Sequence, residues 1–408
     1  MYFTFYATEI VGLDIGVVGI LIAATKVLEA AFSLMVGFIV DKTNTRFGKG
    51  RPYSLFLLPM WLSVIFLFST PDLSMTGRTI YVFALYCLVN AVFNTLLVGG
   101  ESAYMSRAIT EYRHRAQVTS VSAVLVMLIC ATGGILMPQL MATWGTQPGG
   151  WGKIAIVYGL PMCAVGMLRF FFIKEKDDGT TVNSTIKIKT NLRNVMRNKY
   201  IFILAPATAL CLLVQTISSI VGTYYFTYII GDLALMSYAG MIGLASPLLL
   251  LLFPAATRTI GGMNFIRIGL ALAVIGSLIK LINPSNLALV ITSQLLGNLG
   301  LTSLLMMGGY FALQCIDYGE QKTGSRAEGL TSAVSGLFGR VAAGLASVLV
   351  GTAMGVAGYV NNAAQQIPQA ENMIIALYSW IPAVLCAIIL VILHFYDLDC
   401  KLRKGDFL

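Results

Sequence analysis

The stretch GFIVDKTNTRFGKGRPY, residues 37–53, separates two apolar runs of about bilayer-spanning length, 17–40 and 53–69. It contains an acidic residue at an expected helix end, Asp41, which is followed by Arg46, Lys49 and Arg51 in a short turn that contains glycine. Charges in this order can pin two helices together at one membrane surface through ion pairs and helix capping. The stretch therefore predicts a bundle of membrane-spanning helices joined by short polar loops.

The overall composition also indicates a membrane protein. Of the 408 residues, 57% are hydrophobic and only 11% are charged, and the mean hydropathy is +0.80. A soluble protein of this length needs far more charge to cover its surface. The seven cysteines stand singly, and motifs for nucleotide binding, zinc or a nucleophilic serine are absent from the sequence. We therefore expect no enzyme activity, no catalytic residue and no metal site.

Apolar runs of spanning length predict eleven complete spans between charges, prolines and glycines. They are 17–40, 53–69, 80–106, 117–144, 154–173, 200–230, 238–257, 266–282, 287–316, 330–360 and 374–395. The first residues, MYFTFYATEIVG (1–12), are apolar but too few to cross a bilayer, which takes about 20 residues. They predict a partial first helix. They are not typical of a cleavable signal peptide, because they contain no basic start and no small-residue cleavage site.

The basic residues predict the orientation of the spans. Alternate loops, starting with the one after the first full span, hold 21 of the 27 lysines and arginines, whereas the opposite loops hold only Arg78 and Lys153. By the positive-inside rule, the basic side is cytoplasmic, and it includes the central loop and the C-terminus. The net charge of +9 therefore reflects membrane topology. It does not indicate a nucleic-acid partner, because the basic residues are spread along short loops.

A long polar stretch divides the chain into two parts that have similar sequence patterns. We expect an N-terminal helix bundle at 1–173, a cytoplasmic central loop at 174–199, a C-terminal bundle at 200–396 and a cytoplasmic tail at 397–408. The fourth helix of the first part ends in AITEYRHRAQVTS (108–120), and its counterpart ends in CIDYGEQKTGSRAEGLTS (315–332). Both contain an acidic residue followed by tyrosine and then basic residues. Such repeats are typical of transporters that move two halves about a central site.

Five stretches carry a resemblance to a known family. They are YATEIVGLDIGVVG (6–19), the stretch at 37–53 already quoted, TYYFTYIIGD (223–232), DYGEQKTGSRAEGLT (317–331) and FYDLD (395–399). Together they resemble the major facilitator superfamily. NTRFGKGRP (44–52) more specifically resembles its glycoside–pentoside–hexuronide:cation symporters, the family of the melibiose and glucuronide carriers. The resemblance implies an all-α membrane protein of two six-helix bundles. It also implies that the first helix should start before residue 1.

Charges within the predicted spans are few, and each needs a reason because charge inside a bilayer is costly. Lys26 and Glu29 are three residues apart, so they share a helix face and can pair. The resemblance implies that Glu29 occupies the first of two acidic positions that bind the coupling cation, while Ser33 occupies the second. It also implies that Arg340 stands at a lysine position that takes part in coupling. The alternative for these residues is a structural ion-pair cluster.

Three other charged residues in the predicted spans have simpler explanations. Lys280 and Arg169 lie near helix ends, so we expect their side chains to extend to the membrane surface. Glu101 lies toward the cytoplasmic half of its helix. It could contact the substrate or pair with a nearby basic residue, and the sequence does not decide between these roles.

Polar side chains at mid-bilayer are candidates for sugar binding, because sugar hydroxyls need hydrogen-bonding partners. The helical period places Asn90 and Asn94 on one face. The resemblance implies that Gln314 replaces an acidic residue three positions before the DYGE sequence. For each of these residues, an interhelical hydrogen bond is the structural alternative. The predicted substrate-binding residues are Asn90, Asn94, Glu101, Gln215, Thr223, Tyr224, Asn298 and Gln314.

The function that these patterns favour is secondary transport of a sugar, glycoside or hexuronide, coupled to H⁺ or Na⁺ by alternating access. We expect a monomer in the lipid bilayer of the plasma membrane, with no cofactor besides the coupling ion. The alternatives are a lysolipid carrier on the same fold, or a membrane sensor that does not transport. Six residues are expected to latch the cytoplasmic gate: Asp41, Arg46, Lys49, Arg51, Asp317 and Arg326.

Overall fold

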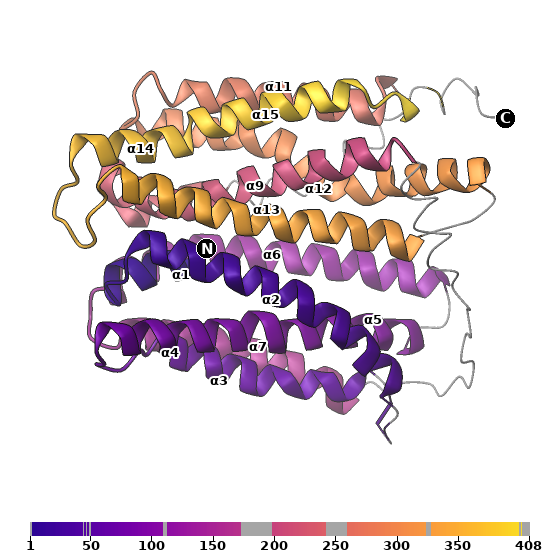
Figure 1. The fold of residues 1–408 in the computed structure, drawn as a ribbon, viewed down its shortest axis with the longest axis horizontal. Helices are drawn as coiled ribbons and strands as arrows, with labels where there is room; N and C mark the ends of the chain where they lie inside the picture. Colours follow the sequence, from indigo (N-terminus) through magenta and orange to yellow (C-terminus); the bar gives the residue numbers. More distant parts are fainter. Residues whose placement is uncertain are drawn as a thin grey trace.

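Long, nearly parallel helices make up the computed structural model (Figure 1), which describes residues 2–43, 45, 47–48, 50–108, 112–172, 198–241, 259–323, 328–399 and 401. The α-helices are α1 (Tyr2–Phe5), α2 (Ile15–Lys42), α3 (Leu57–Leu67), α4 (Met75–Cys87), α5 (Thr95–Ala108), α6 (Tyr112–Trp144), α7 (Gly150–Phe172), α9 (Ile201–Tyr225), α11 (Gly262–Ile279), α12 (Leu287–Thr323), α13 (Glu328–Val356), α14 (Pro368–Tyr378) and α15 (Trp380–His394). Short 3-10 or π-helical segments extend or join them: η1 (Tyr6–Ile10), η2 (Arg51–Phe56), η3 (Leu88–Asn94), η4 (Phe226–Ile230) and η5 (Leu233–Leu235).

These helices match the apolar runs of the sequence. Helices occupy ten of the eleven predicted spans, and most of the remaining one, 238–257, lies outside the described residues. By length and composition, eight helical stretches in the described part of the chain are able to cross a membrane. Two shorter apolar helices, Arg51–Leu67 and Leu128–Trp144, accompany them. The predicted division at 174–199 falls almost wholly on 173–197, which the structure does not describe.

Local sequence explains where the first long helix begins. Asp14 stands just before α2, and its carboxylate accepts hydrogen bonds from the backbone N–H groups of Gly16 and Val17, at 2.8 and 3.1 Å. An aspartate in this position satisfies backbone donors that have no partner within the helix. The cap therefore fixes the junction between η1 and α2.

The two halves of the chain meet along α2 and α13, which lie side by side in the middle of Figure 1. Small residues allow the close approach. A Cβ atom added to Gly19 would lie 2.6 Å from the carbonyl oxygen of Ser347, and one added to Gly351 would lie 2.7 Å from that of Ile15. Helices in membranes pack closely where such small residues face each other. Where α2 and α13 cross, the glycines therefore allow the two backbones to come into contact.

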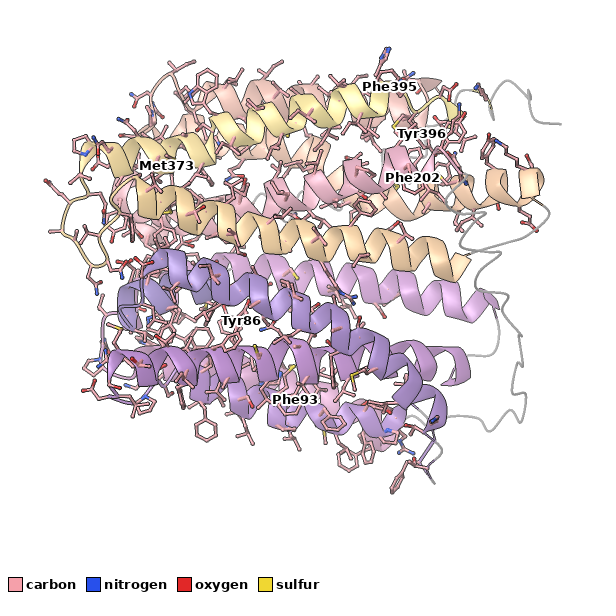
Figure 2. The ribbon with its side chains drawn as sticks, viewed as in Figure 1. Tyr86, Phe93, Phe202, Met373, Phe395 and Tyr396 are labelled. Carbon is pink, nitrogen blue, oxygen red and sulfur yellow. The ribbon has the colours of Figure 1, made fainter. Side chains whose placement is uncertain are left out.

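The closing FYDLD sequence anchors the C-terminal half. Phe395 points outward, whereas Tyr396 turns into the bundle (Figure 2) and is buried. Asp399 accepts hydrogen bonds from the backbone N–H of Met263 and from the Gln314 amide, each at 3.2 Å. These contacts tie the C-terminal end to α11 and α12.

Asp397 links the C-terminal segment to the residue just before α9. It accepts a hydrogen bond from the Tyr200 hydroxyl at 2.7 Å and pairs with Lys401 at 2.6 Å. Burial acts to raise the pKa of Asp397, but the hydrogen bonds from Lys401 and Tyr200 outweigh it and hold this pKa below its ordinary value. The carboxylate is therefore a charged anchor at neutral pH.

Candidate functional site

A cavity of about 770 Å³ lies between the two halves. Its volume falls within the range of about 300–1,000 Å³ that is usual for small-molecule sites. The N-terminal half contributes polar groups of Lys26, Tyr86 and Asn90, and the C-terminal half contributes several more. Those of the C-terminal half include Gln215, Ser219, Ser277, Lys280, Ser293, Gln294, Asn298, Thr302 and Tyr378. No aspartate or glutamate is among the described residues that line this cavity.

Three of the eight predicted substrate-binding residues line the cavity: Asn90, Gln215 and Asn298. The other five lie elsewhere. Thr223 and Tyr224 are fully buried in the packing of the C-terminal half, and the Tyr224 hydroxyl lies 2.8 Å from that of Thr8. Gln314 donates to Asp399, as described above. The last two, Asn94 and Glu101, are exposed and do not line the cavity.

Asn90 and Asn94 differ in their access to the cavity. Both belong to η3, a π-helical segment in the middle of this span. Only Asn90 lines the cavity, whereas Asn94, four residues further along the helix, is exposed and does not line it. The shared spacing therefore does not make both of them cavity residues.

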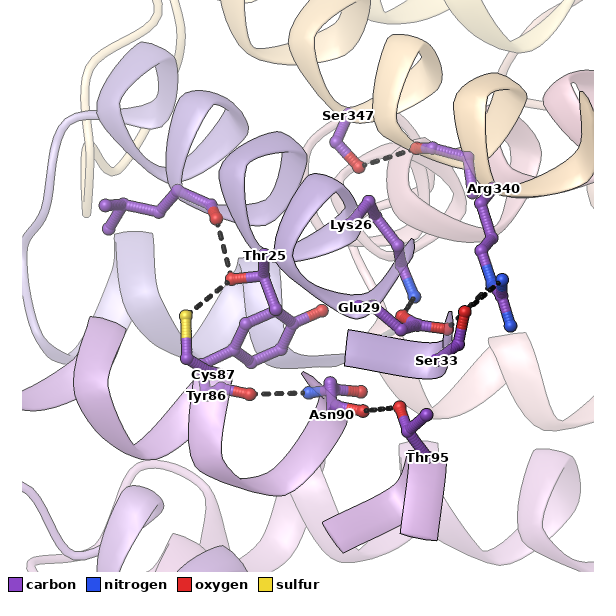
Figure 3. A network of polar contacts seen from close by, with 12 residues as sticks. Thr25, Lys26, Glu29, Ser33, Tyr86, Cys87, Asn90, Thr95, Arg340 and Ser347 are labelled. Atoms are coloured by element: carbon purple, nitrogen blue, oxygen red, sulfur yellow. Dashed lines mark hydrogen bonds and ion pairs between the residues drawn. The ribbon is translucent and has the colours of Figure 1, made fainter. Parts of the chain in front are cut away.

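The four residues predicted for cation coupling form one cluster, shown in Figure 3. Lys26 Nζ lies 2.8 Å from a Glu29 carboxylate oxygen. From the other half, Arg340 Nε lies 3.7 Å from the second Glu29 oxygen, and Arg340 also donates to the Ser33 hydroxyl at 2.9 Å. The Glu29 side chain is only 13% exposed. One largely buried carboxylate thus bridges α2 and α13 with a cation on each side.

The predicted cytoplasmic gate lies largely outside the described part of the chain. Arg46, Lys49 and Arg326 are not described, and neither is the side chain of Asp41. Arg51 is described, and it donates to the backbone carbonyls of Phe170 and Phe171 at the end of α7. Asp317 is exposed at the far end of α12. The Arg51 contacts join η2 to α7 within the N-terminal half.

The opposite end of the molecule contains a polar network that the sequence analysis did not identify. Glu9, in η1, is 5% exposed, and its carboxylate accepts hydrogen bonds from the hydroxyls of Tyr228 and Tyr359 and from the backbone N–H of Asn362. The Asn361 amide donates to the carbonyl of Leu13 nearby. Every one of these bonds joins the first residues of the chain to the C-terminal half. The network therefore holds the two halves together at this end.

A sequence signal for this network did exist. Glu9 lies in the quoted stretch 6–19, and Tyr228 lies in the quoted stretch 223–232. A carboxylate within an apolar run needs a partner, and tyrosines at another helix end can supply one. The prediction of a partial helix at 1–12 depends only on apolar residues, so it does not use the acidic residue at position 9.

Lys280 does not extend to the membrane surface as expected. It is only 5% exposed and lines the cavity from the end of α11. Its ammonium donates to the backbone carbonyl of Tyr378 at 2.6 Å and lies 4.0 Å from the centre of the Tyr378 ring. The expectation was wrong because a nearby carbonyl and aromatic ring hold the side chain inside the bundle. The same expectation was made for Arg169, whose side chain the structure does not describe.

Comparison with known proteins agrees with this architecture. Residues 1–400 match the family described as "MFS/sugar transport protein". An uncharacterized symporter, YnaJ, of Bacillus subtilis (strain 168) is 32% identical over 420 residues, covering 99% of this chain and 88% of that protein. The isoprimeverose transporter of Lactiplantibacillus pentosus is 27% identical, covering 98% of this chain and 84% of that protein.

Solved structures share the fold. A bacterial homolog of the human lysosomal transporter Spinster, in an inward-facing and unoccupied conformation, superposes with a TM-score of 0.72 at 12% identity, covering 97% of this chain and 91% of that one. The relatives and the fold are those of membrane transporters and not of enzymes. The chain is therefore a multi-pass membrane protein that belongs to the MFS/sugar transport protein family.

Proposed function

We propose that this protein is a secondary transporter of a sugar or glycoside, coupled to protons and working by alternating access. The observation that carries the proposal is a cavity that receives polar groups from two halves, which are bridged by a largely buried carboxylate, Glu29. A cavity at the interface of two halves is where a rocking transporter holds its substrate. A buried titratable group that touches both halves is able to link their movement to its own charge.

The lining of the cavity favours a sugar as substrate. Asn90, Gln215, Gln294 and Asn298 offer amide donors and acceptors from both halves. Tyr86 adds an aromatic ring of the kind that packs against the C–H face of a sugar. A lysolipid carrier would instead need a wide apolar surface for an acyl chain. The cavity also has apolar lining residues, among them Ile22, Val214 and Met306, but the amides and hydroxyls contributed by both halves favour the sugar over the lipid.

The charge of the coupling cluster favours protons over sodium. Lys26, Glu29 and Arg340 together carry one net positive charge, and both Glu29 oxygens already face cations. Sodium requires several oxygen ligands and gains from net negative charge, and Ser33 stands where a second carboxylate would help. A proton needs only the carboxylate itself. Glu29 is therefore the proposed proton carrier, and Arg340 its fixed countercharge.

The proposed conformation is inward-facing. The network around Glu9 supports closure at the end opposite the basic loops, and the positive-inside rule assigns the basic end to the cytoplasm. The central loop and the C-terminus would then be cytoplasmic, in a monomer within the plasma membrane. Asp41, Arg46, Lys49, Arg51, Asp317 and Arg326 are the proposed latch of the cytoplasmic gate in the other state.

Uptake by the purified protein in liposomes tests the proposal. Labelled methyl glycosides of glucose, galactose, xylose and glucuronic acid are supplied outside, with either an inward proton gradient or an inward sodium gradient. We expect accumulation of at least one glycoside under the proton gradient, and its collapse when a protonophore is added. Protein-free liposomes are the control. Accumulation of none of the glycosides would contradict the proposed substrate class, and accumulation driven by sodium alone would contradict proton coupling.

A further inference from the structure

Lys280 is a buried lysine that faces the cavity of the proposed sugar site. It lies directly after α11, is 5% exposed, and is one of two lysines that line the cavity. The other, Lys26, is paired with Glu29. Lys280 has no carboxylate partner in the described part of the chain, and its ammonium group bonds to a neutral carbonyl. A buried charge without an opposite charge is unfavourable unless something else balances it.

The break between α14 and α15 explains the carbonyl to which Lys280 bonds. Pro382 has no N–H, so it cannot donate to the carbonyl of Tyr378, four residues earlier. The chain departs from helical geometry at Ser379, where φ is −127° and ψ is −69°. The carbonyl of Tyr378 is thereby left without its usual donor inside the last span. Lys280 supplies that donor, but this bond uses only one of the three N–H groups of its ammonium.

The charges around the cavity remain unbalanced after this bond is made. Lys26, Glu29 and Arg340 sum to one positive charge, and Lys280 adds a second when its amine is protonated. Residues 242–258 carry no carboxylate in the sequence, so this stretch supplies no counter-charge either. Other polar groups of the C-terminal half in this cavity are neutral: Ser277 and Ser293 line it, and Gln294 donates to the Tyr378 hydroxyl. The cavity is therefore suited to an anion.

We propose that Lys280 binds the anionic group of the substrate, and that the transported sugar is an acidic one bearing a carboxylate or sulfonate. The inference rests on the proposed function and narrows its substrate class. A lysine ammonium recognises a carboxylate, sulfonate or phosphate as a point charge. Gln294 and Asn298 lie on α12 within the same cavity and bind the hydroxyls of the sugar.

A purely structural role for Lys280 predicts different behaviour. If its only task is to hold the freed carbonyl of Tyr378, then Lys280→Gln, which keeps an N–H donor but removes the charge, should affect every substrate equally. If Lys280 binds the anion, the same substitution should act on acidic sugars alone. Lys280→Arg keeps the positive charge and should keep the preference for an acidic sugar.

Binding of matched glycosides to the purified full chain tests the inference. Methyl β-glucuronide and methyl β-glucoside differ only at C6, where one carries a carboxylate and the other a neutral CH₂OH, and the corresponding galactose pair gives a second comparison. We expect the wild type to bind the acidic member of at least one pair about 10- to 100-fold more tightly, the range that a charge-assisted hydrogen bond supplies. Lys280→Gln should abolish that preference. Lys153→Gln, which removes an exposed lysine near the start of α7, should keep it.

Each outcome bears on a different proposal. Equal binding of the acidic and neutral members by the wild type would overturn the anion site but leave the proposed sugar transport intact. Binding of neither pair would count against both. If Lys280→Gln does not fold, the wild-type preference and Lys280→Arg still decide the question. Lysophosphatidylglycerol, an anionic lipid, is the competing ligand: binding of this lipid without binding of either acidic glycoside would overturn the inference.

Discussion

Arg340 Nε lies 3.7 Å from a carboxylate oxygen of Glu29, and this contact joins α13 of the C-terminal half to α2 of the N-terminal half. Lys26 holds the other oxygen of the same carboxylate at 2.8 Å. Protonation of Glu29 would remove the negative charge from between two cations. The two halves would then lose an attraction at mid-membrane, and their relative positions would depend on whether Glu29 holds a proton.

Glu29→Gln should uncouple transport from the proton gradient. The amide mimics a permanently protonated carboxylate, so we expect gradient-driven accumulation to fall at least about tenfold, while exchange of labelled for unlabelled sugar persists because it needs no net proton movement. Parallel assays in liposomes measure the two rates. Glu371→Gln, which changes a carboxylate in the first turn of α14, is the matched control. Normal accumulation by Glu29→Gln would rule out coupling through this residue.

Glu9→Gln should loosen the proposed closure at the end of the molecule where Glu9 lies. The substitution weakens hydrogen bonds from Tyr228, Tyr359 and Asn362, which are charge-assisted in the wild type. Loss of about 1.4 kcal/mol from this network would make opening about tenfold more frequent. Cys130 is exposed and lines the cavity, so its labelling by a membrane-impermeant thiol reagent on intact cells reports the opening.

The labelling experiment has a direct control and a clear contrary result. Labelled Cys130 is quantified by mass spectrometry, because five other free cysteines are described. Glu371→Gln should label at the wild-type rate. If Glu9→Gln also labels at the wild-type rate, the Glu9 network is not what closes this end.

Gly351→Val should disturb the crossing of α2 and α13. A Cβ atom at Gly351 would lie 2.7 Å from the carbonyl oxygen of Ile15, so the helices would have to separate. Overpacking of this kind typically costs about 1–3 kcal/mol, and we expect a lower unfolding temperature in detergent together with faster labelling of Cys130. Gly355→Val makes the same change on the same helix where a Cβ meets nothing within 4 Å. Equal effects of the two substitutions would argue against a specific close contact.

Asn298→Ala and Gln314→Ala should separate substrate binding from structure, although both residues lie on α12. Asn298 lines the cavity, so its loss should weaken sugar binding about tenfold and leave thermal stability close to that of the wild type. Gln314 donates to Asp399, so its loss should lower stability and leave affinity unchanged. Binding measurements and thermal unfolding on the same preparations check both expectations. The reverse pattern would contradict the assignment of Asn298 to the site.

Short-range patterns in the sequence were enough to predict most of the helices and one ion pair. The apolar run at 17–40 became α2, because a span is selected by hydrophobicity along its own length. Lys26 and Glu29 pair as predicted, because residues three apart share a face of any α-helix. Spacing was not enough for Asn90 and Asn94, because only Asn90 lines the cavity and no local pattern shows how far along the helix the cavity extends. Arg340 beside Ser33 and Glu29 was expected only from the family resemblance, since the residues are far apart in the chain.

The sequence by itself determined which segments cross the membrane, and it concentrated the positive charge on alternate loops, because both properties depend on local composition. Only the tertiary structure decided which polar groups meet. In the folded chain, Glu9 accepts hydrogen bonds from Tyr228 and Tyr359, and Gln314 donates to Asp399. Lys280 donates to the carbonyl of Tyr378, which Pro382 leaves without its usual donor. The physical reason is that a polar group inside a membrane must find a partner, and how the helices cross decides which partner lies within reach.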